Sequence, residues 1–228
     1  MTVYRRFWHR ITEKERSIST ITRMAISIPS NHCLTTRRAK VDDFFYRSPP
    51  DEKADLIDGT VYVSPPESIH EHDVRMFVAL TIGRFIGHMR IVGHVFNCRV
   101  AFMFSSDCAI EPDVGYVAPE RAHLIGEDRV QGPPDLAVEV ISDATRVYDL
   151  EVKRALYAEN GVREFLTIDP ILGDARCEVL QRRRYVACQL DGSAFRSTVI
   201  PGFWLNLDWL LSNPVADESS CLRQILAG

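Results

Sequence analysis

Two acidic residues, Asp113 and Glu139, have the sequence positions that most strongly indicate a chemical role. Glu139 lies in the run 135–141 (DLAVEVI), a predicted strand that is apolar on both faces. A carboxylate buried there needs a cation, a metal or strong hydrogen-bond donors beside it. Asp113 follows Pro112 and opens the predicted strand 114–117. If these strands are neighbours, the two carboxylates meet at one point and offer the oxygen ligands that Mg²⁺ needs.

A lysine fourteen residues after Glu139 adds to this pattern. In a helix predicted over residues 149–160, Asp149, Lys153 and Tyr157 share one face at four-residue spacing. A lysine facing two carboxylates would position a water or stabilise the charge that develops in phosphoryl transfer. Simpler interpretations remain open: Glu139 as a structural ion pair or a strand end that reaches water, and Asp149–Lys153 as a surface helix pair.

The elements that must position these residues follow from turn and capping signals. Asp58-Gly59 predicts a tight turn within a hairpin over 55–63, and Ser68 with Glu71 forms a capping box that opens an amphipathic helix. Gly161 is a suitable helix end. The remaining predicted elements are helical turns over 40–47, strands over 91–98, 99–104, 112–118, 164–168, 176–181 and 185–190, and short helices over 119–124 and 203–211. Strands followed by a strand–helix–strand unit predict an α/β (α+β) fold with a mixed central sheet flanked by helices.

Composition excludes several classes of protein. The 228 residues are 46% hydrophobic and 25% charged, which is typical of a globular domain with its own core and not of a disordered chain or a coiled-coil rod. No apolar run is long enough to cross a membrane. The six cysteines are scattered without a CxxC pair, which argues against a structural zinc site and a disulfide scaffold. We therefore expect a protein of the reducing cytoplasm.

Positive charge is concentrated at the start of the chain, and the rest of the chain is acidic. Residues 1–40 carry +7, and because the whole chain carries −4, residues 41–228 carry −11. We expect residues 1–33 to form a poorly packed basic extension and residues 34–228 a single domain. The extension could be an arm that touches nucleic acid, a transit peptide, or a stretch without a fold upstream of an alternative start at Met24. The acidic body argues against unspecific binding of nucleic acid.

Three segments carry a resemblance to a known family: DLIDGTVYVSPPESIHEH (55–72), EPDVGYVAPER (111–121) and the long run 132–170 from GPPDLAVEVISD to TIDP. Over roughly residues 40–211 the chain resembles the Uma family of putative restriction endonucleases, within the PD-(D/E)XK nuclease superfamily. The resemblance implies a restriction-endonuclease-like core, with the hairpin over 176–190 towards its C-terminal end.

The resemblance also implies roles for individual residues. Asp113 and Glu139 would be metal ligands, with the Val140 carbonyl as a third. Ile141 occupies the place of the usual lysine, and Lys153 on the following helix takes that part. Asp55 stands where the family has a glutamate, which leaves open whether it reaches the metal. The remaining implied residues support the site or contact the substrate: His70, Ser142, Thr145 and Asp149.

The function implied is hydrolysis of phosphodiester bonds in DNA by an endonuclease that uses Mg²⁺, with Mn²⁺ as a substitute. The alternatives are a nuclease-fold binding or scaffold protein with little catalysis, and a nuclease directed at RNA. The sequence leaves a homodimer open, and it does not specify a target. His70 and His72 point in different directions from a helix and cannot share one ion. The basic run 182–184 is a solvated turn or a contact for a phosphate backbone.

Overall fold

The computed structural model describes residues 33–35, 40–42, 44 and 52–228. The predicted extension 1–33 therefore lies outside the described residues except for Cys33, which begins strand β1 (Cys33–Thr35) and belongs to a sheet. Of the helical turns predicted over 40–47, residues 40–42 and 44 are described. Val41 and Phe44 are buried there in a small apolar cluster with Leu56.

The larger of the described sheets is mixed, as predicted. Its strands run in the order β11-β10-β9-β8-β7-β4, and β8 and β9 are the parallel pair while the other neighbours are antiparallel. The strands are β4 (His94–Asn97), β7 (Val114–Val117), β8 (Leu136–Val140), β9 (Glu164–Asp169), β10 (Asp174–Gln181) and β11 (Arg184–Ala187). The β10–β11 pair is the predicted hairpin, and the fold class is confirmed.

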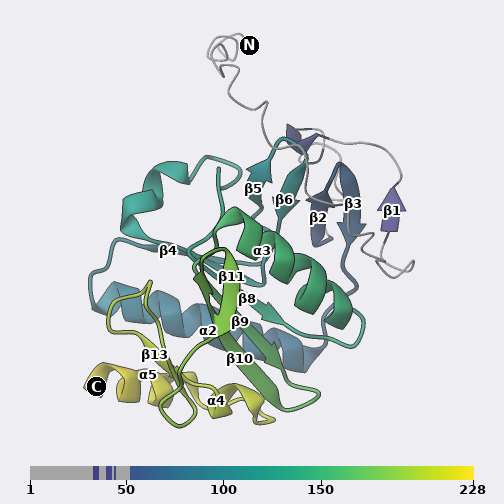
Figure 1. Cartoon of the computed structure of the whole chain (residues 1–228). Helices are drawn as coiled ribbons and strands as arrows, with labels where there is room; N and C mark the ends of the chain where they lie inside the picture. The colour runs from purple at the N-terminus through teal and green to yellow at the C-terminus, as the bar shows by residue number, and fades with distance from the viewer. Residues whose placement is uncertain (1–32, 36–39, 43, 45–51) are drawn as a thin grey trace, which may run out of the picture.

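Helices cover both faces of this sheet (Figure 1). Side chains along β8 alternate between these two faces. Leu136, Val138 and Val140 pack in one cluster with α2 (Ile69–His88) and α5 (Glu218–Ala227). Ala137 faces the other way, towards the π-helix η2 (Tyr148–Lys153) and α3 (Arg154–Asn160). Glu139 alternates in phase with Ala137. Its carboxylate is therefore directed towards η2 and α3.

A second sheet lies beside the first, at the top of the view in Figure 1. Its order is β1-β3-β2-β6-β5, with β2 (Ala54–Ile57), β3 (Thr60–Val63), β5 (Phe102–Ser105) and β6 (Cys108–Ile110). The predicted β2–β3 hairpin turns at Asp58 and Gly59, whose φ values of 50° and 74° match the expected turn. Residues 111–113 carry the chain from β6 in this sheet to β7 in the other. This second sheet was not predicted.

Local signals predicted three of the helix ends correctly. Ser68 accepts a hydrogen bond from Glu71 N while the Glu71 carboxylate accepts one from Ser68 N, so the capping box opens α2 as predicted. Gly161 ends α3 with a φ of 84°. Pro119 opens the short 3-10 helix η1 (Pro119–Leu124) over the predicted residues.

Some predicted bounds were wrong. The strands predicted over 91–98 and 99–104 are shorter, because Cys98 and Arg99 adopt φ values of 43° and 60° and turn the chain between them. The predicted helix 203–211 begins as β13 (Trp204–Asn206), paired with β12 (Ala194–Arg196), and only then forms α4 (Asp208–Leu211). Buried and partly exposed residues alternate over 203–207, which is the period of a strand.

The spacing of the cysteines argued against a disulfide scaffold and did not predict the one disulfide that the described residues form. Cys177 and Cys188 are joined by a disulfide between neighbouring strand segments. Their partnership depends on the β10–β11 register, and Cys188 N also donates to Cys177 O. Over the part of the chain described here, no helix is both long and apolar enough to cross a membrane.

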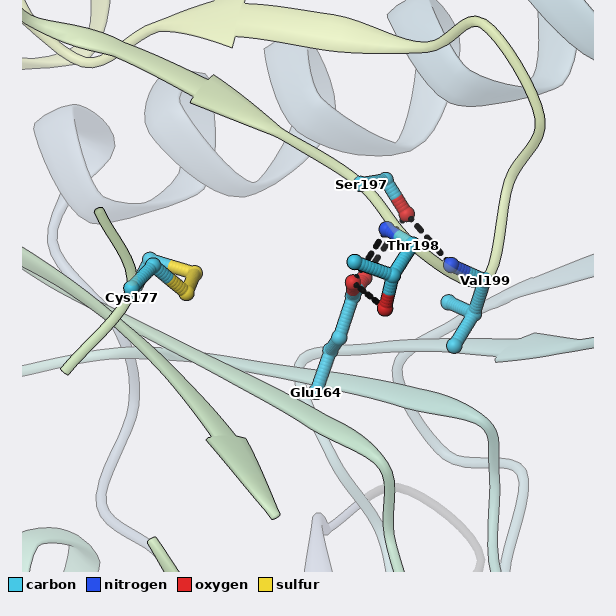
Figure 2. Close-up of a disulfide and its surroundings, with 6 residues drawn as sticks. Glu164, Cys177, Ser197, Thr198 and Val199 are labelled. Atoms are coloured by element: carbon cyan, nitrogen blue, oxygen red, sulfur yellow. Dashed lines mark hydrogen bonds between the residues drawn. A yellow bond between two sulfur atoms is a disulfide. The ribbon is translucent and has the colours of Figure 1, made fainter. Parts of the chain in front are cut away.

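A buried carboxylate ties the C-terminal part of the chain to the central sheet. Glu164 in β9 is fully buried and accepts hydrogen bonds from Ser197 Oγ, Thr198 N and Thr198 Oγ1 at 2.7, 2.5 and 2.6 Å (Figure 2). The next residues, 199–207, contribute apolar side chains to the cluster that packs α2 and α5 against the sheet. Glu164 therefore positions a segment that the core needs.

We predict that Glu164→Ala lowers the free energy of unfolding by at least about 2 kcal/mol, because three hydrogen bonds to a buried carboxylate are lost. Urea unfolding followed by circular dichroism measures the change. Glu159→Ala, at an exposed position of α3, is the matched control and should unfold like the parent. Equal stability of the two variants would mean that Glu164 does not hold this segment.

Candidate active site

Asp113, immediately before β7, lies opposite Glu139 of the neighbouring strand β8. The antiparallel register pairs Val114 with Val138, so the next positions along it are Asp113 and Glu139. Val140 N donates a 2.7 Å hydrogen bond to Asp113 Oδ2, which fixes the Asp113 carboxylate beside the end of β8. Glu139 is fully buried. The structure therefore brings together the two acids that the sequence selected.

A lysine from the other sheet lies against both acids. Lys53 precedes β2, and its Nζ is 2.7 Å from Asp113 Oδ1 and 3.8 Å from Glu139 Oε2. Ser64 N donates to the Lys53 carbonyl oxygen, which holds the backbone of Lys53 in place. One ammonium group therefore bridges the two carboxylates, and the bridge joins the two sheets.

Lys153 lies deeper and is surrounded by carboxylates. Its Nζ is 3.1 Å from Glu139 Oε2, 3.4 Å from Asp55 Oδ2 and 3.4 Å from Asp149 Oδ1, and its side chain is 1% exposed. Asp55 is held on its other sides by Glu111 N at 2.6 Å and Tyr148 OH at 2.9 Å. With both oxygens engaged and no exposed surface, Asp55 anchors Lys153 in this structure.

Glu139 is contacted by side chains from the π-helix η2 and from α3. Asp149 and Lys153 both lie in η2, and Tyr157 follows in α3, where its hydroxyl donates to Glu139 Oε1 at 2.5 Å. The shared face predicted for these three residues is present, although the first part of the helix has π geometry in place of α. Such segments are rare and occur often at functional sites, because they redirect side chains locally.

Burial and neighbouring charge set the ionisation of these groups. Burial raises the pKa of Glu139 to about 8, although Lys153 and Lys53 act in the opposite direction. Burial also raises the pKa of Asp149. For Asp113 burial is outweighed by the Lys53 ammonium group, which holds the pKa of this carboxyl below its usual value. The surrounding carboxylates likewise outweigh burial at Lys53 and Lys153, so the pKa of each lysine is raised and both stay charged.

A small cavity of about 50 Å³ opens onto the ion cluster. Its lining residues are Lys53, Ser64, Pro65, Pro66, Glu67, Glu71, Asp113, Val140, Ser142, Thr145, Asp149 and Lys153. Ser142 and Thr145 lie at its wall and bind each other through their side chains at 2.9 Å. His70 is half-buried in the first turn of α2 and does not line the cavity.

Sequence reasoning missed Lys53, Glu111, Tyr148 and the part played by Tyr157. Lys53 and Asp55 are two residues apart at a strand and therefore face the same way, so alternation along 53–57 is a signal that could have found Lys53. Glu111 is buried and accepts a hydrogen bond from Ala54 N. Burial and the adjacent Asp55 raise the pKa of Glu111 to about 7.

A mixed sheet between helices, with one acid in β8, another immediately before β7 and Lys53 between them, has the organisation of a restriction-endonuclease-like fold. Residues 41–208 match the Uma2 family, described as putative restriction endonuclease, and the chain belongs to this family. The crystal structure of a putative nuclease belonging to DUF820 from Anabaena variabilis ATCC 29413 is similar in fold, with a TM-score of 0.63 and 14% sequence identity. The similarity covers 75% of this chain and 97% of that chain. A search among curated proteins found no match.

We predict that Lys153→Met lowers the free energy of unfolding by about 3–5 kcal/mol near pH 8, because three buried carboxylates lose a shared cation. The loss should be smaller at pH 5, where carboxyl groups with raised pKa values take up protons. Denaturant unfolding at both pH values measures it, and Lys40→Met, at a largely exposed lysine, is the control. A loss that is equal at both pH values would contradict this account of the cluster.

The raised pKa of Glu111 predicts a second pH effect. Because the folded protein binds this proton more tightly than the unfolded chain, its stabilising contribution is complete below about pH 4.5 and is lost as the pH rises to about 7. Glu111→Gln keeps an acceptor for Ala54 N without the charge. Between pH 5 and pH 8 in EDTA, this variant should lose roughly 1–3 kcal/mol less stability than the parent. Parallel pH profiles of variant and parent would refute the assignment.

Proposed function

We propose that this protein is a metal-dependent endonuclease that hydrolyses phosphodiester bonds of DNA. The observation that carries the proposal is the meeting of Asp113 and Glu139, from adjacent strands, at the ammonium group of Lys53 beside an open cavity. Membership of the Uma2 family supports a nuclease. The choice of DNA follows the family's description as restriction endonucleases.

The donor set of the site fits Mg²⁺. The carboxylates of Asp113 and Glu139, with the Val140 carbonyl, would provide hard oxygen ligands, and Mn²⁺ would bind the same atoms. A cationic group already lies against both carboxylates in this structure, because Lys53 Nζ contacts each of them. Over the described residues no group of three or more His, Cys, Asp or Glu side chains is suited to hold a metal. A bound Mg²⁺ would therefore keep several waters, as it commonly does.

Charge balance in the cluster also supports a divalent cation. Asp55, Asp113, Glu139 and Asp149 can carry four negative charges, against two positive charges on Lys53 and Lys153. Burial raises the pKa of Glu139 to about 8 and also raises the pKa of Asp149, which favours protons on these carboxyl groups and so reduces the excess. A divalent ion would balance the excess and allow those protons to leave.

The proposed reaction is the hydrolysis of a phosphodiester bond. A water oxygen forms a bond to phosphorus, the bond between phosphorus and one sugar oxygen breaks, and one proton leaves the water while another reaches the departing oxygen. When bound, Mg²⁺ would lower the pKa of a water molecule and offset charge on the phosphate. The lysine ammonium groups supply fixed positive charge beside the acids, where it can stabilise the oxygens of the transition state.

Purified protein should nick supercoiled DNA in the presence of Mg²⁺ or Mn²⁺, and EDTA should stop the reaction. Asp113→Ala and Glu139→Ala should each slow cutting by at least about 100-fold, a loss of roughly 3 kcal/mol in transition-state stabilisation. Agarose gel assays give the rates, thermal melts show that both variants fold, and Glu159→Ala is the control for loss of an acid outside the site. An RNA of the same sequence tests the choice of substrate.

Each outcome has a definite meaning. Unchanged cutting by both acid variants would remove the proposed site, and cutting in excess EDTA would remove the metal. Cleavage of the RNA but not of the DNA would reassign the substrate. Binding of DNA without cutting under any metal would favour a nuclease-fold binding protein.

A further inference from the structure

The two lysines of the site have different surroundings. Lys153 contacts three carboxylates and keeps 1% of its side chain exposed. Lys53 is 2.7 Å from Asp113 but 3.8 Å from Glu139, its other carboxylate partner, and it keeps 16% of its side chain exposed at the cavity. A molecule that enters the cavity therefore meets the Lys53 ammonium group before it meets that of Lys153.

The strand that carries Glu139 cannot supply a lysine itself. Two residues after Glu139 stands Ile141, which is fully buried, and its N–H donates to Ile168 O across the sheet. Any lysine that contacts a substrate at this site must therefore come from another element. Among the described residues, Lys53 from the second sheet and Lys153 from η2 are the lysines that line the cavity.

We propose, resting on the proposed function, that Lys53 is the lysine that contacts the phosphate of the substrate and that Lys153 is a positioning residue. Lys153 holds Glu139 and Asp149 in place, and its charge is already shared among carboxylates. A phosphate oxygen would have to displace one of those carboxylates to reach it, which is costly in a buried site. Lys53 can turn towards a phosphate when Asp113 gains another cationic partner, because a lysine ammonium sits on a flexible four-carbon stem.

The backbone around Lys53 is suited to this task. Ser64 N donates to the Lys53 carbonyl oxygen at 2.9 Å, and the following residue, Ala54, donates its N–H to Glu111 Oε2. Hydrogen bonds on both sides of the residue fix the origin of its side chain at the rim of the cavity. The ammonium group is thus placed by the second sheet, while Asp113 and Glu139 are placed by the first.

A competing account makes Lys53 only a counter-ion. In that account its ammonium group compensates Asp113 and Glu139 in the metal-free protein and has no contact with substrate once a divalent ion is bound. The two accounts differ in what happens after Lys53 is removed and metal is supplied in excess. A counter-ion becomes unnecessary, whereas a group that contacts phosphate is still missing.

The experiment compares Lys53→Met and Lys53→Arg with the parent, using Lys40→Met as a matched control at an exposed lysine. Three quantities are measured: the single-turnover rate at saturating DNA and Mg²⁺, the affinity for a DNA duplex in Ca²⁺, and the affinity of the DNA-free protein for Mn²⁺ by calorimetry. We expect Lys53→Met to cut at least 100-fold more slowly and to bind the duplex several-fold more weakly. Its Mn²⁺ affinity should be equal or higher, because a competing cation is gone.

The arginine variant separates charge from shape. Lys53→Arg should recover part of the DNA affinity and less of the rate, because it retains the charge in a larger planar group. If Lys53→Met does not fold, Lys53→Arg alone tests the proposal. A normal Mn²⁺ affinity of Lys53→Arg, together with a reduced cutting rate and a reduced duplex affinity, then supports the proposal. Parent-like values of all three quantities in Lys53→Arg, with no folded Lys53→Met, would count against contact with phosphate.

Other outcomes overturn the inference. Parent-like cutting by Lys53→Met at saturating Mg²⁺ would show that Lys53 is a counter-ion. If the parent binds DNA but cuts nothing, the proposed function fails, while the duplex affinities still decide on Lys53: equal affinities of parent and Lys53→Met would refute contact with phosphate. If the parent neither binds nor cuts DNA, both proposals fall.

Discussion

The structure depends on the burial of charge at the junction of its two sheets. Glu139 lies on a strand whose other residues are apolar, and an isolated carboxylate there would be very costly to desolvate. The cost is offset by Lys153, Lys53 and the hydroxyl of Tyr157, which come from three different elements. Since each of these groups must arrive at the same point, the two sheets and the helix after β8 can be arranged in few other ways.

This constraint explains the local features around the site. The segment 111–113 crosses from the second sheet to the first, so Asp113 reaches Glu139 while Glu111 stays bonded to Ala54 N. Asp149 and Lys153 lie in the π-helix after β8, where Lys153 contacts both Glu139 and Asp149. The same arrangement leaves one side of the cluster open to a cavity, where only part of the charge is compensated. In the proposed function, a cation and a phosphate would enter the site through this opening.

Much of this could be predicted from sequence because the signals are local. The capping box at Ser68, the turn at Asp58 and the helix end at Gly161 each depend on a few neighbouring residues. The lone acid in an apolar strand identified Glu139, because a buried charge needs partners. Lys53 was not found, since its partner Asp113 lies 60 residues away; alternation along the strand places Lys53 on the same side as Asp55 but does not identify that partner. The Cys177–Cys188 disulfide was missed for a similar reason: it depends on the register of two strands, which spacing alone does not determine.

The most direct test of the central claim is a crystal structure of the protein soaked in Mn²⁺, with the metal located by its anomalous scattering. The account predicts a single strong peak bounded by one oxygen each of Asp113 and Glu139, at about 2 Å from both. It also predicts that the Lys53 ammonium group has moved away from Asp113. A peak at another place, or none at these two carboxylates at a Mn²⁺ concentration that supports cutting, would contradict the account.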